Sequence, residues 1–155
     1  MAECVQGESN SFFFVPASLG GYAPLTVKKQ IPIGQGNLLS VLKAHLTVDE
    51  VGRGVAYVAH STVVAGARIE LPRIDIDVPW AAFLVFVDRE PTANWSHSCR
   101  YILINSQNGD VKSFEARLPP FQQDRNFPRW RVLYKAPTVP DAVLPVLQQA
   151  TNHNK

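Results

Sequence analysis

The chain has 155 residues, a formal net charge of +2, 46% hydrophobic residues and 18% charged residues. This length suits one domain, 1–155, that folds unaided, with residues 1–10 expected to be flexible. The small net charge and the lack of like-charge blocks argue against a nucleic-acid-binding class, and the balanced composition argues against disorder.

The sequence also bears on location. The longest apolar run, residues 78–87, is well short of the roughly 20 residues that a membrane-spanning helix needs. The apolar patch at residues 11–16 follows Glu3 and no basic segment, which is atypical of a secretory signal. We therefore expect a cytoplasmic protein without a membrane partner, in which Cys4 and Cys99 are free thiols.

The N-terminal third is expected to hold one helix after loop-like sequence. Residues 11–16 suit a short buried strand or an arm packed on the body, and a further short strand fits near residues 25–29. Residues 37–46 are predicted to form the helix, with Asn37 as its N-cap, because apolar residues recur there every three or four positions.

Beyond this helix the pattern becomes typical of strands. Residues 47–50 are able to begin one more helical turn, which the two following glycines would end. From residue 55 onward β-branched residues dominate. Within residues 67–79 the alternation of apolar and polar residues changes phase at Pro72, which we interpret as a bulge or a bend at a sheet edge.

Two runs, residues 80–88 and 99–105, have apolar residues at both odd and even positions. Such runs predict central strands that are covered on both faces. Asn108 and Gly109 form a strong hairpin-turn pair that leads to a further strand over residues 111–118.

The C-terminal part predicts a last strand and a second helix. Residues 129–136 alternate, with Trp130, Val132 and Tyr134 facing inward, and a helix is expected to start near Pro140. The elements together predict an α+β domain: a mainly antiparallel, curved sheet of five or six strands (a β-meander) with two short helices on one face.

The predicted sheet has more apolar surface than two helices cover. A large apolar side chain left in water forgoes about 1.5–3 kcal/mol of burial, so the second face needs a cover. Three covers are consistent with the sequence: curling of the sheet into a cone, the arm of residues 11–16, or another subunit, most simply a second copy.

A candidate catalytic cluster lies at the start of the second central run. If extended, the chain places Trp95, His97, Cys99 and Tyr101 on one face. His97 could then serve as a base or activate Cys99 as a nucleophile. Residues two apart on a strand are, however, about 7 Å apart, too far for a direct hydrogen bond. In the alternative interpretation Trp95, Cys99 and Tyr101 are core residues and His97 lies at a loop edge.

The loop over residues 88–94 joins the two central strands and could border a pocket, since loops at the ends of rigid sheets often carry function. We therefore place any site here. The candidate catalytic residues are His97, Asp88 and Cys99, and the candidate ligand-binding residues are Trp95, Arg89, Arg100 and Tyr101.

Metal and cofactor motifs are weak. Asp75 and Asp77 share a strand face and could bind a hard cation, but they fit the solvated side of a strand equally well. Histidine and cysteine spacing suggests no zinc site, so we expect no metal. Gly34 and Gly36 lack the rest of a nucleotide-binding fingerprint and fit a plain turn, so we expect no cofactor.

Residues 125–135 interleave arginines with aromatic residues, as in proteins that bind single-stranded nucleic acid. On a strand, however, Arg129 and Arg131 would point away from Trp130 and Tyr134. An amphipathic strand explains this pattern better, and we do not expect a nucleic-acid partner.

Two functions follow from these observations. The leading hypothesis is a non-enzymatic protein-interaction or ligand-binding domain that self-associates through the apolar sheet face or binds another protein or a small apolar ligand. Val85→Glu or Phe83→Glu should then abolish association or folding. The alternative is a small, cofactor-free enzyme of the cone-shaped α+β type, with His97 or Asp88 performing acid–base chemistry in an aromatic-lined cavity and showing a perturbed pKa.

Overall fold

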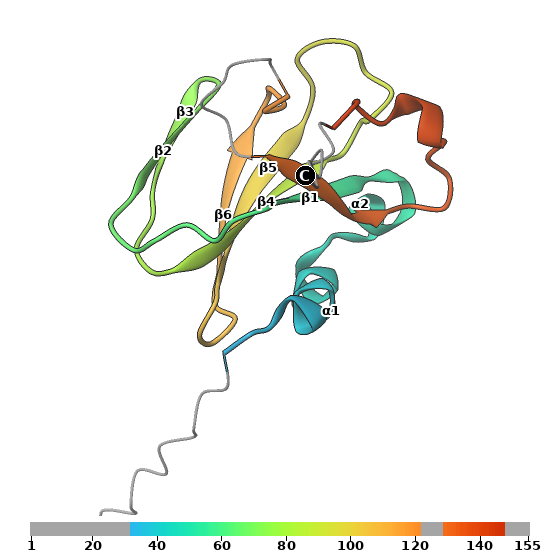
Figure 1. Ribbon diagram of the computed structural model, residues 1–155. Coiled ribbons are helices and arrows are strands. Elements are labelled where there is room, and N and C mark those ends of the chain that lie inside the picture. Colours follow the sequence, from blue (N-terminus) through green and yellow to red (C-terminus); the bar gives the residue numbers. More distant parts are fainter. Residues whose placement is uncertain (1–31, 122–128, 148–155) are drawn as a thin grey trace, which may run out of the picture.

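The computed structural model describes residues 32–121 and 129–147 (Figure 1), so the predictions for residues 1–10, 11–16 and 25–29 lie outside the described residues. The elements in chain order are α1 (Gln35–His45), α2 (Val48–Arg53), β1 (Val55–Ala59), β2 (Arg68–Leu71), β3 (Ile74–Asp77), β4 (Ala82–Asp88), β5 (Cys99–Asn105), β6 (Val111–Ala116), β7 (Trp130–Lys135) and the 3-10 turn η1 (Asp141–Val143).

The prediction of an α+β fold is confirmed. Five strands form an antiparallel sheet in the order β6-β5-β4-β1-β7, and β2 and β3 form a separate two-stranded hairpin. Gly109, with φ +79°, lies in the turn between β5 and β6, where the sequence predicted a hairpin. Within the described residues no helix is long and apolar enough to cross a bilayer.

The structure differs from two of the helix predictions. The N-cap of α1 is Gly34 rather than Asn37, since Asn37 already lies in the first turn and its amide donates to the Gly34 carbonyl oxygen at 3.0 Å. The helix predicted from Pro140 is wrong over residues 140–147, where only η1 forms. Pro145 lacks an amide donor and disfavours helical geometry at the residue before it, and Leu144 is extended.

The change of phase at Pro72 is a tight turn, so our interpretation as a bulge or edge bend is wrong. Leu71 pairs directly with Ile74, which leaves Pro72 and Arg73 as the reversal. Proline presets the first turn position, and Arg73 takes φ +60° at the second. Because two residues form the reversal, the inward side chains fall on odd positions before it and on even positions after it, which is the change of phase seen in the sequence.

Both faces of the five-stranded sheet are covered. One face, the helix face, packs against α1; the other, the hairpin face, packs against residues of the β2–β3 hairpin and of the C-terminal segment (Figure 1). The sequence indicated neither of these as a cover for the second face. The helix-face core contains Leu38, Leu42, Ala56, Val58, Phe83, Val85, Val87, Ile102 and Ile104. The hairpin-face core includes Tyr57, Leu71, Ile76, Val78, Phe86, Tyr101, Trp130 and Val139.

Candidate functional site

The candidate residues gather at one end of β4 and β5, but on opposite faces of the sheet. Successive residues of a strand point to opposite faces. Arg100 therefore lies on the helix face, where it meets Glu50 of α2. Asp88 is paired in register with Val55 and Cys99, both in the hairpin-face core, and it contacts His97. The structure thus divides the predicted site into two clusters.

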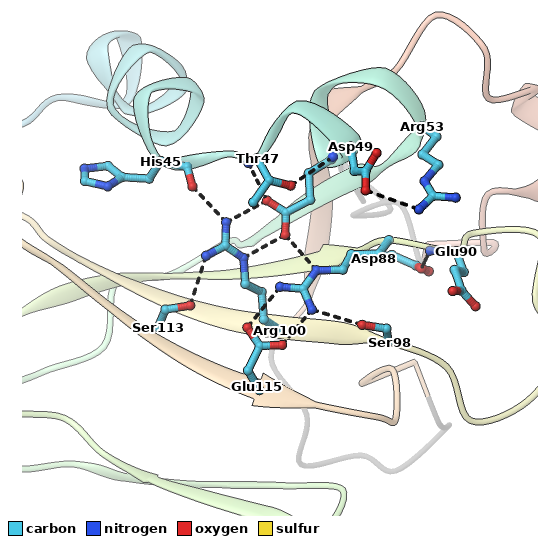
Figure 2. Close-up of polar contacts among 12 residues, drawn as sticks. His45, Thr47, Asp49, Arg53, Asp88, Glu90, Ser98, Arg100, Ser113 and Glu115 are labelled. Atoms are coloured by element: carbon cyan, nitrogen blue, oxygen red, sulfur yellow. Dashed lines mark hydrogen bonds and ion pairs between the residues drawn. The ribbon is translucent and has the colours of Figure 1, made fainter.

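The first cluster, the charge cluster, consists of Glu50, Arg89, Arg100 and Glu115 (Figure 2). The side chain of Glu50 is 0% exposed and accepts from Nε and Nη2 of Arg100 at 2.8 and 2.6 Å and from Nε of Arg89 at 2.9 Å. Arg89 also donates through Nη1 and Nη2 to the two carboxylate oxygens of Glu115, at 2.6 and 2.9 Å. Both guanidinium groups therefore bind carboxylates within the fold.

Local sequence explains how Glu50 is positioned. Thr47 caps α2, its Oγ1 accepting from the Glu50 amide at 3.2 Å, while the Thr47 amide donates to Oε2 of Glu50 at 2.9 Å. Arg100 additionally donates to the carbonyl oxygen of His45, the last residue of α1, at 2.8 Å. Arg100 thus joins β5 to both helices. Sequence reasoning missed Glu50, although Thr47 and Glu50 have the spacing of a capping box.

The charge cluster holds its carboxylates ionised. Burial alone would raise the pKa of Glu50, but the hydrogen bonds from Arg100, Thr47 and Arg89 outweigh it and lower that pKa from its usual 4.5. The hydrogen bond from Arg89 is the main cause of the lowered pKa of Glu115. Both carboxylates therefore stay charged and paired at neutral pH.

Acid is expected to weaken the domain through these two groups. Because their pKa values are lowered by folding, the stability they contribute is present above the unfolded value of 4.5 and is lost as the pH falls toward the folded values. Urea unfolding at about pH 6 and about pH 3.5 should show a smaller pH-dependent loss in Glu50→Gln than in the wild type. Glu70→Gln, at an exposed position, is the control. An undiminished loss in Glu50→Gln would contradict this account.

The second cluster, the His97 cluster, lies at the base of the loop of residues 89–98. The ring Nδ1 of His97 is 2.6 Å from the Trp95 carbonyl oxygen, and Nε2 is 2.9 Å from Oδ1 of Asp88. The same Oδ1 accepts from the Glu90 amide at 2.9 Å, and the His97 amide donates to the Arg117 carbonyl oxygen at 3.0 Å. Both His97 and Asp88 are buried. The cluster therefore ties both ends of the loop to the sheet.

Cys99 and Tyr101 are core residues, as the alternative interpretation expected. Both are fully buried. Burial, followed by the charge of Asp88, raises the pKa of the Cys99 thiol to about 12, so it is not a thiolate at neutral pH. The Tyr101 hydroxyl donates to the Leu118 carbonyl oxygen at 3.2 Å. The ring nitrogens of His97 contact Asp88 and Trp95 rather than Cys99.

Trp95 is not a core residue, contrary to that interpretation. It is 86% exposed, because β5 begins only at Cys99 and the preceding loop does not continue the alternation of the strand. The four candidate ligand-binding residues consequently do not converge: Trp95 is on the loop surface, Tyr101 is in the core, and Arg89 and Arg100 belong to the charge cluster.

The other candidates occupy structural positions. Asp75 and Asp77 are exposed, and both bind the Arg68 guanidinium, at 2.7 and 3.2 Å. Arg131 donates to the side chain of Gln35 in α1 at 3.4 Å, whereas Trp130 lies in the hairpin-face core. The Arg131 and Trp130 side chains thus point apart. Tyr134 follows a register shift opposite Ala56 and Tyr57, so it packs against both cores rather than only inward with Trp130, and its hydroxyl donates to the Val51 carbonyl oxygen of α2. Arg125 and Phe127 lie outside the described residues. Over 32–121 and 129–147, no three His, Cys, Asp or Glu side chains are grouped to hold a metal.

Comparisons of the chain with protein-family models, with curated proteins and with solved structures each gave no match. A function therefore has to be argued from the geometry of the two clusters and the loop that they support.

Proposed function

We propose that the chain is a non-enzymatic protein-interaction domain whose docking element is the loop of residues 89–98. The observation that carries the proposal is that Trp95 has an exposed side chain on an anchored backbone. Its side chain is 86% exposed, yet its backbone carbonyl accepts a 2.6 Å hydrogen bond from the buried ring of His97. An exposed indole on an anchored backbone is suited to insert into an apolar pocket of a partner protein.

The loop is ordered before any partner arrives. The Ala93 amide donates to the Glu90 carbonyl oxygen at 2.8 Å, the Glu90 amide donates to Asp88, and the His97 amide donates to the Arg117 carbonyl oxygen. Ordering a loop on binding costs conformational entropy, and a loop that is already fixed avoids much of that cost. Tryptophan offers a large apolar area and one polar donor, and it is enriched among residues that dominate binding energy.

The non-enzymatic part of the proposal is supported by the contacts that the candidate catalytic groups already make within the fold. A general base must reach the proton that it abstracts, but both ring nitrogens of His97 already contact groups of the fold. Burial is the main cause of the raised pKa of Asp88, and a buried structural pair accounts for that shift as well as an active site does. The enzymatic alternative and the small apolar ligand stay predictions.

The partner contact is proposed at the loop and not at a sheet face, since both faces pack against elements of the same chain. A second copy of the chain is one protein that could present the required pocket, whereas the sequence predicted self-association through the apolar sheet face. Self-association therefore remains a prediction, and it is measured in the same experiment that tests the loop.

Trp95→Ala is expected to weaken association by about thirtyfold or more, because truncating a dominant interface residue costs about 2 kcal/mol or more. Its free energy of unfolding should change by less than about 0.5 kcal/mol, since the side chain is exposed. Sedimentation velocity over a concentration series measures self-association, and quantitative affinity capture measures binding of other proteins.

The control for this variant is Val48→Ala, at a side chain that is 91% exposed on α2. It should bind as the wild type does. If Trp95→Ala and Val48→Ala keep the same complexes with the same affinity, the loop is not the docking element.

A further inference from the structure

The contacts of His97 determine how many protons His97 and Asp88 hold together. The ring lies between two acceptors, the Trp95 carbonyl oxygen at 2.6 Å from Nδ1 and the Asp88 carboxyl Oδ1 at 2.9 Å from Nε2. A carbonyl oxygen only accepts, so Nδ1 must carry a hydrogen. The contact at Nε2 then needs a second hydrogen, either on Nε2 facing a carboxylate or on the Asp88 carboxyl facing a neutral ring. In both arrangements, His97 and Asp88 together hold two protons.

Loss of one of these protons breaks a contact. If Nδ1 keeps its hydrogen, the lone pair of Nε2 faces the Asp88 carboxylate; if Nε2 keeps it, the lone pair of Nδ1 faces the Trp95 carbonyl oxygen. Either way two acceptors meet inside a buried site, which is unfavourable. We propose that the proton shared by His97 and Asp88 latches the loop of residues 89–98, and that the loop opens when this proton is lost as the pH rises.

The charged and titratable groups around the pair fit a retained proton. Burial is the main cause of the raised pKa of Asp88; the charge of His97 and the hydrogen bonds from the Glu90 amide and from His97 oppose the rise, and the negative charge of Glu90 adds to it least. Burial, and then the charge of Asp88, raises the pKa of Cys99, so the Cys99 thiol stays neutral around pH 7. The titratable groups whose charges act on Asp88 or are affected by it are Tyr57 on β1, Glu90 in the loop and Cys99 on β5. Arg89 and Glu115 belong to the charge cluster on the helix face, and their charges act on Cys99 with opposite sign.

The direction of the effect follows from linkage. Above the pKa of an exposed histidine the open loop has lost the proton that the closed loop keeps. The closed state is therefore fully favoured below that pH and is lost as the pH rises until the closed pair also releases the proton. The consequence that partner binding through Trp95 weakens at high pH rests on the proposed function. The latch itself is a property of the chain alone and is therefore tested without a partner.

The test is NMR spectroscopy of the full chain between about pH 5 and about pH 10, a range that includes histidine titration. Ring shifts of His97 report the tautomer and the loss of the proton. Amide protection factors at Glu90, Ala93 and His97 report opening of the loop, with the intrinsic pH dependence of exchange divided out. We expect a ring with hydrogen on Nδ1 while the loop is closed. The protection factors should fall about tenfold or more across the pH at which the shared proton leaves. A tenfold fall is the change expected when the closed loop binds this proton about ten times more tightly than the open loop.

A matched pair of variants isolates the ring. His97→Gln supplies an amide that cannot lose its proton, so protection at Glu90 and Ala93 should no longer depend on pH. His60→Gln, at an exposed histidine, should keep the wild-type dependence. Protection that is unchanged through the His97 transition, or a His97 that does not titrate, would overturn the proposal. The wild-type measurement decides the matter even where His97→Gln fails to fold, and an intact latch with no effect of Trp95→Ala on binding would refute only the proposed function.

Discussion

Replacing Glu50 with alanine is expected to lower the free energy of unfolding by about 3–5 kcal/mol, the usual cost of removing one partner of a buried ion pair. The Glu50 side chain is fully buried and accepts hydrogen bonds from both Arg89 and Arg100. Without it these guanidinium groups keep the cost of leaving water but lose their shared carboxylate, although Arg89 retains Glu115. The connection from α2 to β5 through Arg100 is lost as well, while the Tyr134 hydroxyl of β7 still donates to the Val51 carbonyl oxygen of α2. Urea unfolding at neutral pH measures the change.

Two further variants separate the causes. Asp49→Ala removes the partner of Arg53 from the same helix; that pair is 3.4 Å apart and mostly exposed, so we expect a loss below about 1 kcal/mol. Glu50→Gln keeps the shape of the side chain and removes its charge. We expect its loss of unfolding free energy to lie between the losses of Glu50→Ala and Asp49→Ala. Similar losses for Glu50→Ala and Asp49→Ala would mean that the charge cluster does not stabilise the fold.

Val85→Glu is expected to prevent folding altogether. Val85 is fully buried on the helix face, in the same core as Leu38 and Leu42 of α1. A carboxylate there has no partner, and the resulting loss should exceed about 5 kcal/mol, comparable with the whole stability of a small domain. Circular dichroism and one-dimensional NMR spectra of the purified variant report whether tertiary structure remains.

This substitution also distinguishes the two uses considered for an apolar sheet face. A face that a second copy covers would leave Val85→Glu as a folded monomer, whereas a face covered by α1 leaves an unfolded chain. Val48→Glu is the control, since Val48 is 91% exposed at the first position of α2, where a negative charge favours the helix. A folded, monomeric Val85→Glu would contradict the packing of α1 and favour self-association through the sheet.

The central part of the fold was predictable because its signals are local. The strands β4 and β5 are apolar at nearly every position, and this pattern indicates burial on both faces wherever the partners come from. The Asn108–Gly109 pair likewise predicts a hairpin from two residues. The helix expected from Pro140 failed because the chain near Pro145 cannot continue the backbone hydrogen bonds of a helix.

The candidate site was predicted as a region but not as an arrangement. The sequence indicated residues 88–101, and the structure does bring His97 and Asp88 together there. That contact joins the end of β4 to the segment before β5, so it depends on strand register, which no local pattern contains. The pairing of Glu50 with Arg100 spans fifty positions, and only the docking of α2 on the sheet creates it.

By itself, the sequence determined the strands of the five-stranded sheet, where the chain turns at Asn108–Gly109, and that both faces of the central strands are buried. These features depend on interactions between near neighbours and on the period of apolar residues. Only the tertiary structure decided what covers each face, that Trp95 is exposed while His97 is buried, and that Glu50 binds two arginines. These features depend on contacts between residues far apart in the chain, whose geometry is set when the helices and the hairpin pack on the sheet.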